Sequence, residues 1–283
     1  MARRPAGLVT VPDPGPARPA SRDVYSHGHH ASVLRSHTWR GAANSAGFLL
    51  PHLRPGLRLL DVGCGPGTIT ADLADLVGPG PVIGLDRAPE VVAAAAAGQH
   101  RSNLAFVVGD AYALGVPDET FDVVYAHQVL QHVSDPVAVL RELRRVCRPG
   151  GVVAARDSDY GAFVWSPADP LLDRWRSLYY DLTRHNRAEA DAGRFLDRWA
   201  RAAGFAEVRR SSSTWAFETP DERAWWGGLW ADRVRHSAFA VQTLAYGLTT
   251  TDELERIAGA FERWAADPDG RFVVVHGEIL ATG

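Results

Sequence analysis

The 283-residue chain contains no lysine, so all thirty of its basic residues are arginine, and it contains only two cysteines, Cys64 and Cys147. Two cysteines provide no disulfide framework and suit a reducing compartment. No apolar run approaches the roughly 18 residues of a membrane span, and the longest bland stretch is VVAAAAAG. The proline-rich start, MARRPAGLVTVPDPGPARP, lacks the continuous apolar segment of a signal peptide. These absences predict a cytoplasmic protein with no stable membrane insertion.

A strongly basic field is also missing. The formal net charge is -3 and the isoelectric point is about 6.4, which does not favour binding to nucleic acid. Hydrophobic residues make up 46% and charged residues 22%, as is usual for a globular chain of this length. We therefore expect a small molecule as the partner, no nucleic acid, and a monomer or a homodimer.

From about residue 57, strand-like and helix-like segments alternate along the chain. Five short apolar runs are typical of buried strands, namely LRLLDVG, PVIGLD, NLAFVVGD, FDVVYAHQ and GVVAARDSD. Such alternation predicts a parallel sheet covered by helices on both faces. Residues 165–201 are expected to be helical without a strand, and residues 221–247 and 250–270 to form two further helices. GFAEVRRSSSTWAFET and RFVVVHGEIL return to strand character.

The most informative stretch is LLDVGCGPGT, which follows the first expected strand. Its glycines, Gly63, Gly65 and Gly67, have G-x-G-x-G spacing, and Thr68 stands where a dinucleotide-binding loop has its third glycine. This spacing disfavours NAD or FAD and hence a dehydrogenase. Glycines let the backbone turn sharply and let a ligand approach the main chain, and the helix that follows offers free N–H groups.

Two aspartates follow the next strands at the same edge of the expected sheet. Asp86 ends the second strand in GLDRAP, and Asp110 ends the third in VVGDAYAL. Ligands of open α/β sheets bind outside the carboxyl ends of the strands, where a carboxylate can bind both ribose hydroxyls. For either aspartate alone, the alternative is that it caps a following helix. The glycine loop and two acids together favour one ligand crevice.

Four motifs resemble those of class I S-adenosylmethionine-dependent methyltransferases of the type found in ubiquinone and menaquinone biosynthesis. They are LLDVGCGPGT, GLDRAP, GDAYALGVPDETFDVVYAHQVLQHVSDP and LRELRRVCRPGG, and the resemblance covers roughly residues 25–157. It implies an α/β, Rossmann-like, seven-stranded, mostly parallel sheet with an N-terminal helical cap. It also implies S-adenosyl-L-methionine as cofactor and S-adenosyl-L-homocysteine as product. The helical insertion before the last strand departs from the family pattern.

The resemblance implies cofactor-binding residues in the glycine loop, after the second, third and fourth strands, and in the cap. They are Tyr25, Arg40, Asp61, Gly63, Cys64, Gly65, Asp86, Arg87, Asp110, Ala111 and His127. Asp86 would hold the ribose, and Asp110 would meet the amino edge of the adenine. Arg40 would meet the cofactor carboxylate, because arginine forms directed, charge-assisted pairs with carboxylates.

The same reasoning divides the chain into four parts. Residues 1–22 are expected to form a disordered tail, residues 23–56 a helical cap, and residues 57–160 the cofactor-binding core. Residues 161–283 would form the helical insertion, a candidate lid, together with the closing strands.

Methyl transfer is an in-line displacement on an activated carbon, so the protein mainly has to position the reactants. A base is required only when the acceptor is poorly acidic. His127, His132 and Asp157 are the expected candidates, although a core or cap role for His132 and loop solvation of Asp157 are equal alternatives. His29, His30 and Trp230 are the expected substrate contacts.

The histidines of HGHH, residues 27–30, raise the question of a metal site. Neighbouring imidazoles in a strand point to opposite faces, and His30 and His37 lie two helical turns apart, with no cysteine or carboxylate nearby. We expect no metal. Two alternatives to a small-molecule methyltransferase stay open: a cofactor-binding protein that transfers no methyl group, and a methyltransferase for prenylated quinones.

Overall fold

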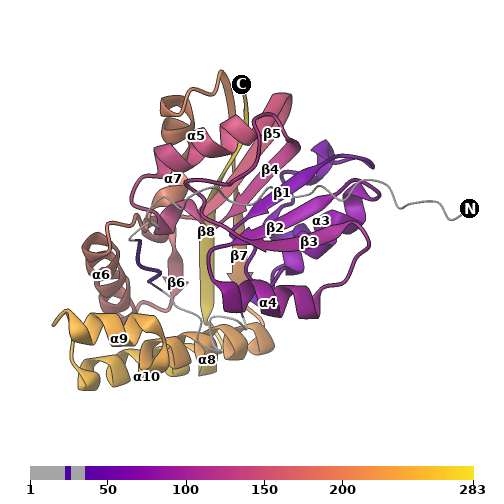
Figure 1. Ribbon diagram of the computed structural model, residues 1–283. Helices are drawn as coiled ribbons and strands as arrows, with labels where there is room; N and C mark the ends of the chain where they lie inside the picture. Colours follow the sequence, from indigo (N-terminus) through magenta and orange to yellow (C-terminus); the bar gives the residue numbers. More distant parts are fainter. Residues whose placement is uncertain (1–22, 27–35) are drawn as a thin grey trace, which may run out of the picture.

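The computed structural model describes residues 23–26 and 36–283 (Figure 1). The expected tail, residues 1–22, and residues 27–35 of the expected cap lie outside the described residues. The strands are β1 (Leu59–Val62), β2 (Val82–Asp86), β3 (Leu104–Val108), β4 (Phe121–His127), β5 (Cys147–Ser158), β6 (Val164–Ser166), β7 (Glu207–Phe217) and β8 (Arg271–Thr282).

The helices of the described residues include three short 3-10 turns. The α-helices are α2 (Ala42–Ser45), α3 (Thr68–Val77), α4 (Pro89–Gly98), α5 (Pro136–Val146), α6 (Pro170–His185), α7 (Ala192–Ala202), α8 (Pro220–His236), α9 (Ala238–Ala245) and α10 (Thr251–Ala266). The 3-10 turns are η1 (Leu50–His52), η2 (Leu130–His132) and η3 (Tyr160–Ala162).

The strands form one sheet in which β3, β2, β1, β4 and β5 are parallel neighbours in that order. β8 lies between β5 and β7 and is antiparallel to both. The predicted mixed α/β fold with a mostly parallel, Rossmann-like sheet is confirmed. Because β1 to β5 are parallel, their carboxyl ends meet at one edge.

The predicted number of strands, seven, is wrong, because the sheet of the described residues has eight. The additional strand is β6, whose residues pair with Arg271 to Val273 of β8. β5 pairs with β8 only from His276 onward, so β6 satisfies backbone groups that β8 would otherwise leave without partners. Three residues are too short to show the alternation by which a strand is recognised in sequence.

Helix ends follow local sequence. Asp135 accepts a hydrogen bond from the Ala138 amide at 2.9 Å and begins α5, and Thr219 and Glu222 form a capping box at the start of α8. The expected helix 221–247 is in fact two helices, α8 and α9. The break lies at Ser237, whose hydroxyl accepts a hydrogen bond from the Phe239 amide and so begins a new helix.

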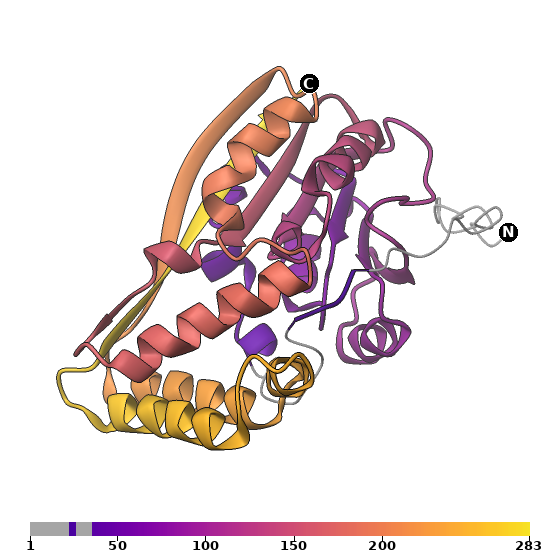
Figure 2. The ribbon, with the colours of Figure 1, turned by 90° about the vertical axis from the view of Figure 1, so that its left-hand side faces the viewer.

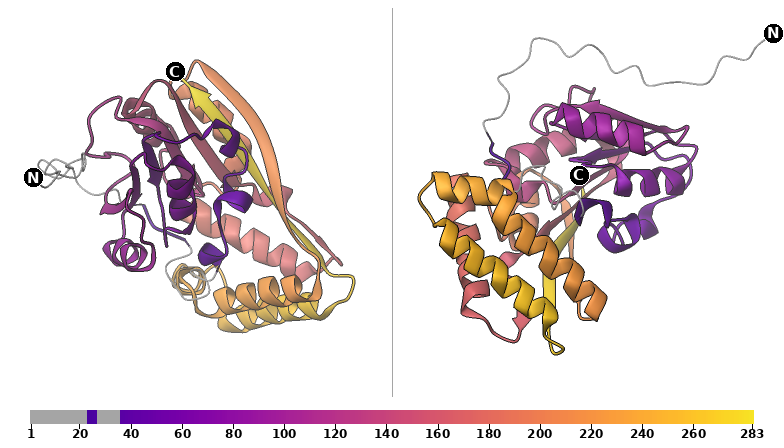
Figure 3. Two further views of the ribbon diagram at one scale, coloured as in Figure 1. Left: turned by 90° about the vertical axis from the view of Figure 1, so that its right-hand side faces the viewer. Right: turned by 90° about the horizontal axis from the view of Figure 1, so that it is seen from below.

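Different helices cover the two faces of the sheet, and a third core lies at one end. The side chains of α3 and of residues 42–53 pack on one face, and those of α5 and α7 pack on the other. Helices α8, α9 and α10 gather below the parallel strands, with α6 beside them (Figures 1 and 2). Figure 3 shows from below how these helices lie under the ends of β7 and β8.

This third core is aromatic. Trp175 is fully buried at its centre and contacts Trp230 and Phe261 edge to face, with ring centroids 4.6 and 5.3 Å away. Edge-to-face contacts of this kind favour a fixed arrangement of helices. None of the helices in the described part of the chain is of a length and apolarity that would let it cross a membrane.

Candidate functional site

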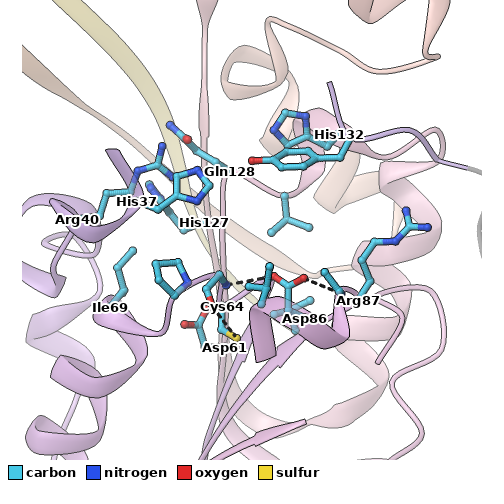
Figure 4. A pocket seen from close by; sticks show the side chains of 18 of the residues that line it. His37, Arg40, Asp61, Cys64, Ile69, Asp86, Arg87, His127, Gln128 and His132 are labelled. Carbon is cyan, nitrogen blue, oxygen red and sulfur yellow. Dashed lines mark hydrogen bonds between the residues drawn. The ribbon is translucent and has the colours of Figure 1, made fainter. Parts of the chain in front are cut away.

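A pocket of about 440 Å³ opens at the carboxyl ends of the parallel strands and extends to the tryptophans of β7 and α8. Figure 4 shows Asp86 and Arg87 at one side of this pocket, and His37, Arg40 and Gln128 across from them. One end is therefore built from the glycine loop and the strand ends, and the other from the insertion.

The glycine loop has the conformation that its sequence suggests. Gly63, Gly65 and Gly67 have φ angles of 73°, 53° and 77°, in the left-handed region that favours glycine. The Gly65 amide donates to Asp86 Oδ2 at 3.1 Å, so the loop and the second strand are tied together. A Cβ atom on Gly63 would lie 2.4 Å from Cγ2 of Val129. Side chains are thus excluded where the loop faces the pocket.

Asp61 supports the loop from beneath. Its side chain is buried and accepts a hydrogen bond from the Thr70 hydroxyl at 2.6 Å, which joins β1 to the first turn of α3. Burial raises the pKa of Asp61 to about 7. The neighbouring thiol of Cys64 is also buried, and burial raises its pKa strongly, so Cys64 is no reactive thiolate.

Asp86 and Asp110 both line the pocket. Asp86 Oδ1 accepts from the Ala88 amide at 3.1 Å, and Asp110 Oδ1 accepts from the Tyr112 amide at 3.0 Å. Each aspartate therefore holds its own loop, although neither caps a helix: the N-cap of α4 is Ala88, and the element that follows Asp110 is β4. An ionised carboxylate offers about four acceptor positions, so both retain capacity for a ligand hydroxyl or amino group. Support of the loop and binding of a ligand are therefore compatible roles for each aspartate.

A short N-terminal segment, residues 23–26, crosses from the sheet to the insertion. The Asp23 carbonyl accepts from Arg87 at 2.9 Å, and its carboxylate accepts from the Tyr112 hydroxyl at 2.8 Å. At the other end, Asn186 of the insertion donates to the Ser26 hydroxyl at 3.0 Å. No local pattern predicts these partners, because they lie far from residues 23–26 in the chain.

Arg40 and His127 line the pocket beside Trp215. Arg40 has its guanidinium carbon 5.4 Å from the Trp215 ring, and its buried Nε has no hydrogen-bond partner among the described residues. Burial lowers the pKa of Arg40 to about 9. Both ring nitrogens of His127 are likewise buried without a partner in the described part of the chain. Such groups are suited to a polar ligand in the pocket.

His127 is a neutral imidazole in this structure. Burial lowers its pKa well below the ordinary value, and the nearby charges of Arg156 and Arg40 lower it further. A neutral imidazole offers one donor and one acceptor. The same surroundings oppose formation of the imidazolium, so His127 is suited to hydrogen bonding better than to taking a proton.

His132 and Asp157 differ in their access to the pocket. His132 lines it and contacts the Tyr25 ring edge to face, with centroids 4.7 Å apart. Asp157 is fully buried, does not line the pocket, and accepts a hydrogen bond from the Gln131 amide at 3.0 Å. Burial raises the pKa of Asp157 to about 8. The sequence places Asp157 at the end of a strand and so predicts access to the pocket. In the structure Asp157 lies beneath η2 and has no such access.

We expect the environment of His132 to make the protein sensitive to acid. Burial, together with Arg40, lowers the pKa of His132 to about 3. The unfolded chain, with an ordinary pKa near 6.5, binds this proton where the folded protein does not, so stability falls as pH decreases below about 6.5. Between about pH 7.5 and 5, the loss of unfolding free energy should be smaller in His132→Gln by about 1 to 2 kcal/mol. Urea unfolding at both pH values measures it, and parallel pH profiles would contradict the assignment.

Gln128 was not among the predicted residues, although it lines the pocket. Its φ angle is 55°, an uncommon conformation for a residue other than glycine and one that often occurs at functional sites. Its amide contacts the Ser158 hydroxyl at 2.9 Å and the His276 ring at 3.0 Å. The sequence does not predict this backbone conformation. It does place Gln128 directly after an expected strand, at the edge of the sheet where ligands bind.

Other predicted residues have mixed outcomes. Tyr25, Ala111 and Trp230 line the pocket, whereas His29 and His30 lie outside the described residues. No group of three or more His, Cys, Asp or Glu side chains within residues 23–26 and 36–283 is placed to hold a metal ion.

Comparisons of the sequence with known proteins indicate the family of the chain. Residues 60–155 match the family model described as a methyltransferase domain. An uncharacterized methyltransferase of Schizosaccharomyces pombe is 33% identical over 276 residues, which cover 93% of this chain and 98% of that protein. A 2-phytyl-1,4-naphtoquinone methyltransferase of Synechococcus elongatus is 36% identical over 133 residues, 45% of this chain and 54% of that protein.

The fold has solved counterparts. The phosphoethanolamine N-methyltransferase 2 of Haemonchus contortus, solved with phosphomonomethylethanolamine and S-adenosylhomocysteine, aligns with a TM-score of 0.50 at 16% identity. The alignment covers 81% of this chain and 49% of that one. The structural match, at 16% identity, shows only the fold. The Schizosaccharomyces pombe relative, matched over 98% of its length, shows the family. The chain therefore belongs to the class I S-adenosylmethionine-dependent methyltransferases.

Proposed function

We propose that this chain transfers the methyl group of S-adenosyl-L-methionine to a small-molecule acceptor by in-line displacement. The observation that carries the proposal is one pocket with a glycine loop and two aspartates at one end and tryptophans at the other. Its size is ordinary for a small-molecule site.

The residues present fit the cofactor. At Gly65 a Cβ atom would have only His37 Nδ1, at 3.8 Å, within 4 Å, so a ligand can approach the main chain there. Asp86 would bind the ribose and Asp110 the adenine, with Asp61, Cys64 and Gly65 holding the loop in shape. At the other end of the cofactor, the buried guanidinium of Arg40 would pair with its carboxylate, and the neutral ring of His127 would donate a hydrogen bond.

The cofactor, when bound, supplies a methyl group already activated by the sulfonium. The chain's own residues then mainly hold the acceptor in line and keep water out. The buried side chains of Trp215, Trp226 and Trp230 would serve this purpose. His132 and His127 are poor bases in this setting because burial lowers the pKa of each. The acceptor is therefore one whose nucleophile needs no strong base.

The organisation of the chain follows from this assignment. Residues 57–160 would form the cofactor-binding core, residues 23–56 a cap, and residues 161–283 an insertion that closes the acceptor side and completes the sheet. The hydrogen bonds of Asp23 and Ser26 to both parts support the cap. A prenylated quinone remains a candidate acceptor because a naphthoquinone methyltransferase is among the relatives.

Two measurements test the proposed function. Calorimetry should detect binding of S-adenosylhomocysteine and of S-adenosylmethionine, while NAD should not bind. Turnover of labelled S-adenosylmethionine against phenols, quinones, amines and indoles should then reveal methylated product. Failure to bind either adenosyl compound would refute the proposal, and binding without turnover of any acceptor would favour the non-catalytic alternative.

A further inference from the structure

The carboxylates that line the described part of the pocket lie at one end of it, where Arg87 lies beside Asp86. The carboxylates lie around the segment 23–26, the glycine loop and the strand and helix ends next to it, namely Asp23, Asp61, Asp86, Glu90 and Asp110. Toward the tryptophans, the described lining residues include no carboxylate. Two arginines, Arg40 and Arg233, line this end instead. The acceptor end is thus electropositive before any sulfonium is present.

Arg233 is held in place by the helical insertion. It lies in α8, one turn after Trp230, and its guanidinium carbon is 4.9 Å from the centre of that ring. The side chain is only 4% exposed, and it donates a hydrogen bond to the Ser36 hydroxyl. A guanidinium fixed in this manner presents several donors in a planar arrangement that matches a carboxylate or a phenolate.

The positive charge affects the neighbouring groups in a consistent direction. Arg233 and Arg156 each contribute to the lowered pKa of Arg40, and Arg40 contributes to the lowered pKa of His127 and of His132. With Arg40 paired to the cofactor carboxylate, an ammonium group placed here would meet the Arg233 guanidinium and no carboxylate among the described lining residues. An anion would be stabilised, because charge interactions are strong where water is excluded.

The apolar walls determine the shape of the ligand. Trp215, Trp226 and Phe163 are buried and line the pocket, and Trp226 is fixed by a stacked contact with Phe217 at 4.2 Å. The Trp226 indole N–H is buried without a hydrogen-bond partner among the described residues, so it is a donor in need of an acceptor atom. Such walls suit a flat, conjugated molecule that carries oxygen.

We propose that the acceptor is a flat aromatic or conjugated acid, such as an aryl carboxylate, phenol or enol, whose anionic oxygen is bound by Arg233. The inference rests on the proposed function and adds the substrate class to it. A phenol gains from Arg233 when it ionises, whereas an ammonium is repelled by Arg233 and becomes a nucleophile only after it loses a proton. Acidic acceptors are therefore preferred over basic ones of the same shape.

The test uses three naphthalene probes of equal shape with the full chain saturated with S-adenosylhomocysteine. We expect 2-naphthoate to bind at least about tenfold more tightly than 2-naphthamide or 2-naphthylmethylammonium in calorimetry. Equal or weaker binding of the naphthoate, or no detectable binding of it, would overturn the proposal. The protein is first titrated with S-adenosylhomocysteine alone. If the proposed function is wrong, this titration shows no binding, and the result is known before any probe is added.

Variants assign the preference to Arg233. Arg233→Gln should weaken naphthoate binding at least about tenfold and leave naphthamide and S-adenosylhomocysteine within about twofold. Arg235→Gln is the matched control, because Arg235 lies on the same helix and pairs with Glu255 and Glu262 outside the pocket. An equal loss for all three ligands in Arg233→Gln would indicate a structural role and contradict the assignment. The comparison of probes on the unaltered protein decides the substrate class even if that variant does not fold.

Discussion

Replacing Asp86 with alanine is expected to weaken binding of S-adenosylhomocysteine about 100-fold. Hydrogen bonds to a charged group contribute about 1.5 to 3 kcal/mol each, so loss of two bonds to the ribose hydroxyls at the lower end, about 3 kcal/mol, corresponds to roughly this factor. The carboxylate also accepts the Gly65 and Ala88 amides. Its removal therefore loosens the glycine loop as well, and both effects weaken binding.

Isothermal calorimetry with the product measures this effect, with circular dichroism to verify the fold. Asp86→Asn separates the two causes, because the amide keeps one acceptor oxygen but loses the charge, so an intermediate affinity is expected. Asp75→Ala is the matched control. Asp75 is 55% exposed, lies on α3, and pairs with Arg101 outside the pocket. If Asp86→Ala binds within threefold of the unaltered protein, the aspartate has no place in the cofactor site.

The parallel part of the fold was accessible from the sequence because its strands are short, continuously apolar and separated by helices with clear ends. Each of the five expected runs corresponds to one strand of β1 to β5. The glycine loop was equally accessible, because glycine at Gly63, Gly65 and Gly67 is required by the backbone itself. Features that depend only on neighbouring residues, such as these strands and this loop, can be predicted from the sequence.

The rest depends on contacts between distant parts of the chain. β6 forms only because β8 extends beyond β5, and three residues carry no recognisable pattern. Gln128 meets His276, 148 positions away. Nothing near either residue predicts that contact. The two arginines toward the tryptophans, Arg40 and Arg233, also meet only in the folded chain, because they lie 193 positions apart in the sequence.

One such group of distant residues lies beneath the acceptor end. Arg156 and Glu278 are 1% and 5% exposed, and the Nε of Arg156 lies 3.3 Å from Oε1 of Glu278. The arginine also donates to the His276 ring at 3.0 Å, and the Ser211 hydroxyl donates to Glu278 at 2.7 Å. Because arginine can only donate, Nδ1 of His276 is its acceptor and the proton of the neutral ring is on Nε2.

This tautomer has a consequence for Gln128. The Gln128 amide nitrogen is placed 3.0 Å from Nε2 of His276. Two donors form no hydrogen bond, so the amide is better turned with its oxygen toward the ring, where the Ser158 hydroxyl can also donate to it. The Arg156 guanidinium carbon also lies 4.7 Å from the Trp215 ring. The buried pair thus fixes two residues that line the pocket, Gln128 and Trp215. Its integrity affects both the stability of the sheet and the shape of the site.

Glu278→Leu is expected to lower the free energy of unfolding by about 3 to 5 kcal/mol, because it leaves the Arg156 cation buried without its carboxylate. The double variant Arg156→Met with Glu278→Leu should be more stable than Glu278→Leu alone, since apolar side chains of similar size often replace a buried ion pair at little cost. Urea unfolding measures both, and Glu218→Leu is the control. Glu218 pairs with Arg271 at the surface, where both side chains are about half exposed, so its loss should cost no more than about 1 kcal/mol. The Ser213 hydroxyl accepts from Arg156 and donates to Glu278. A double variant no more stable than Glu278→Leu would show that the hydrogen bonds to His276, Ser211 and Ser213, rather than the charge pair, hold this part of the sheet together.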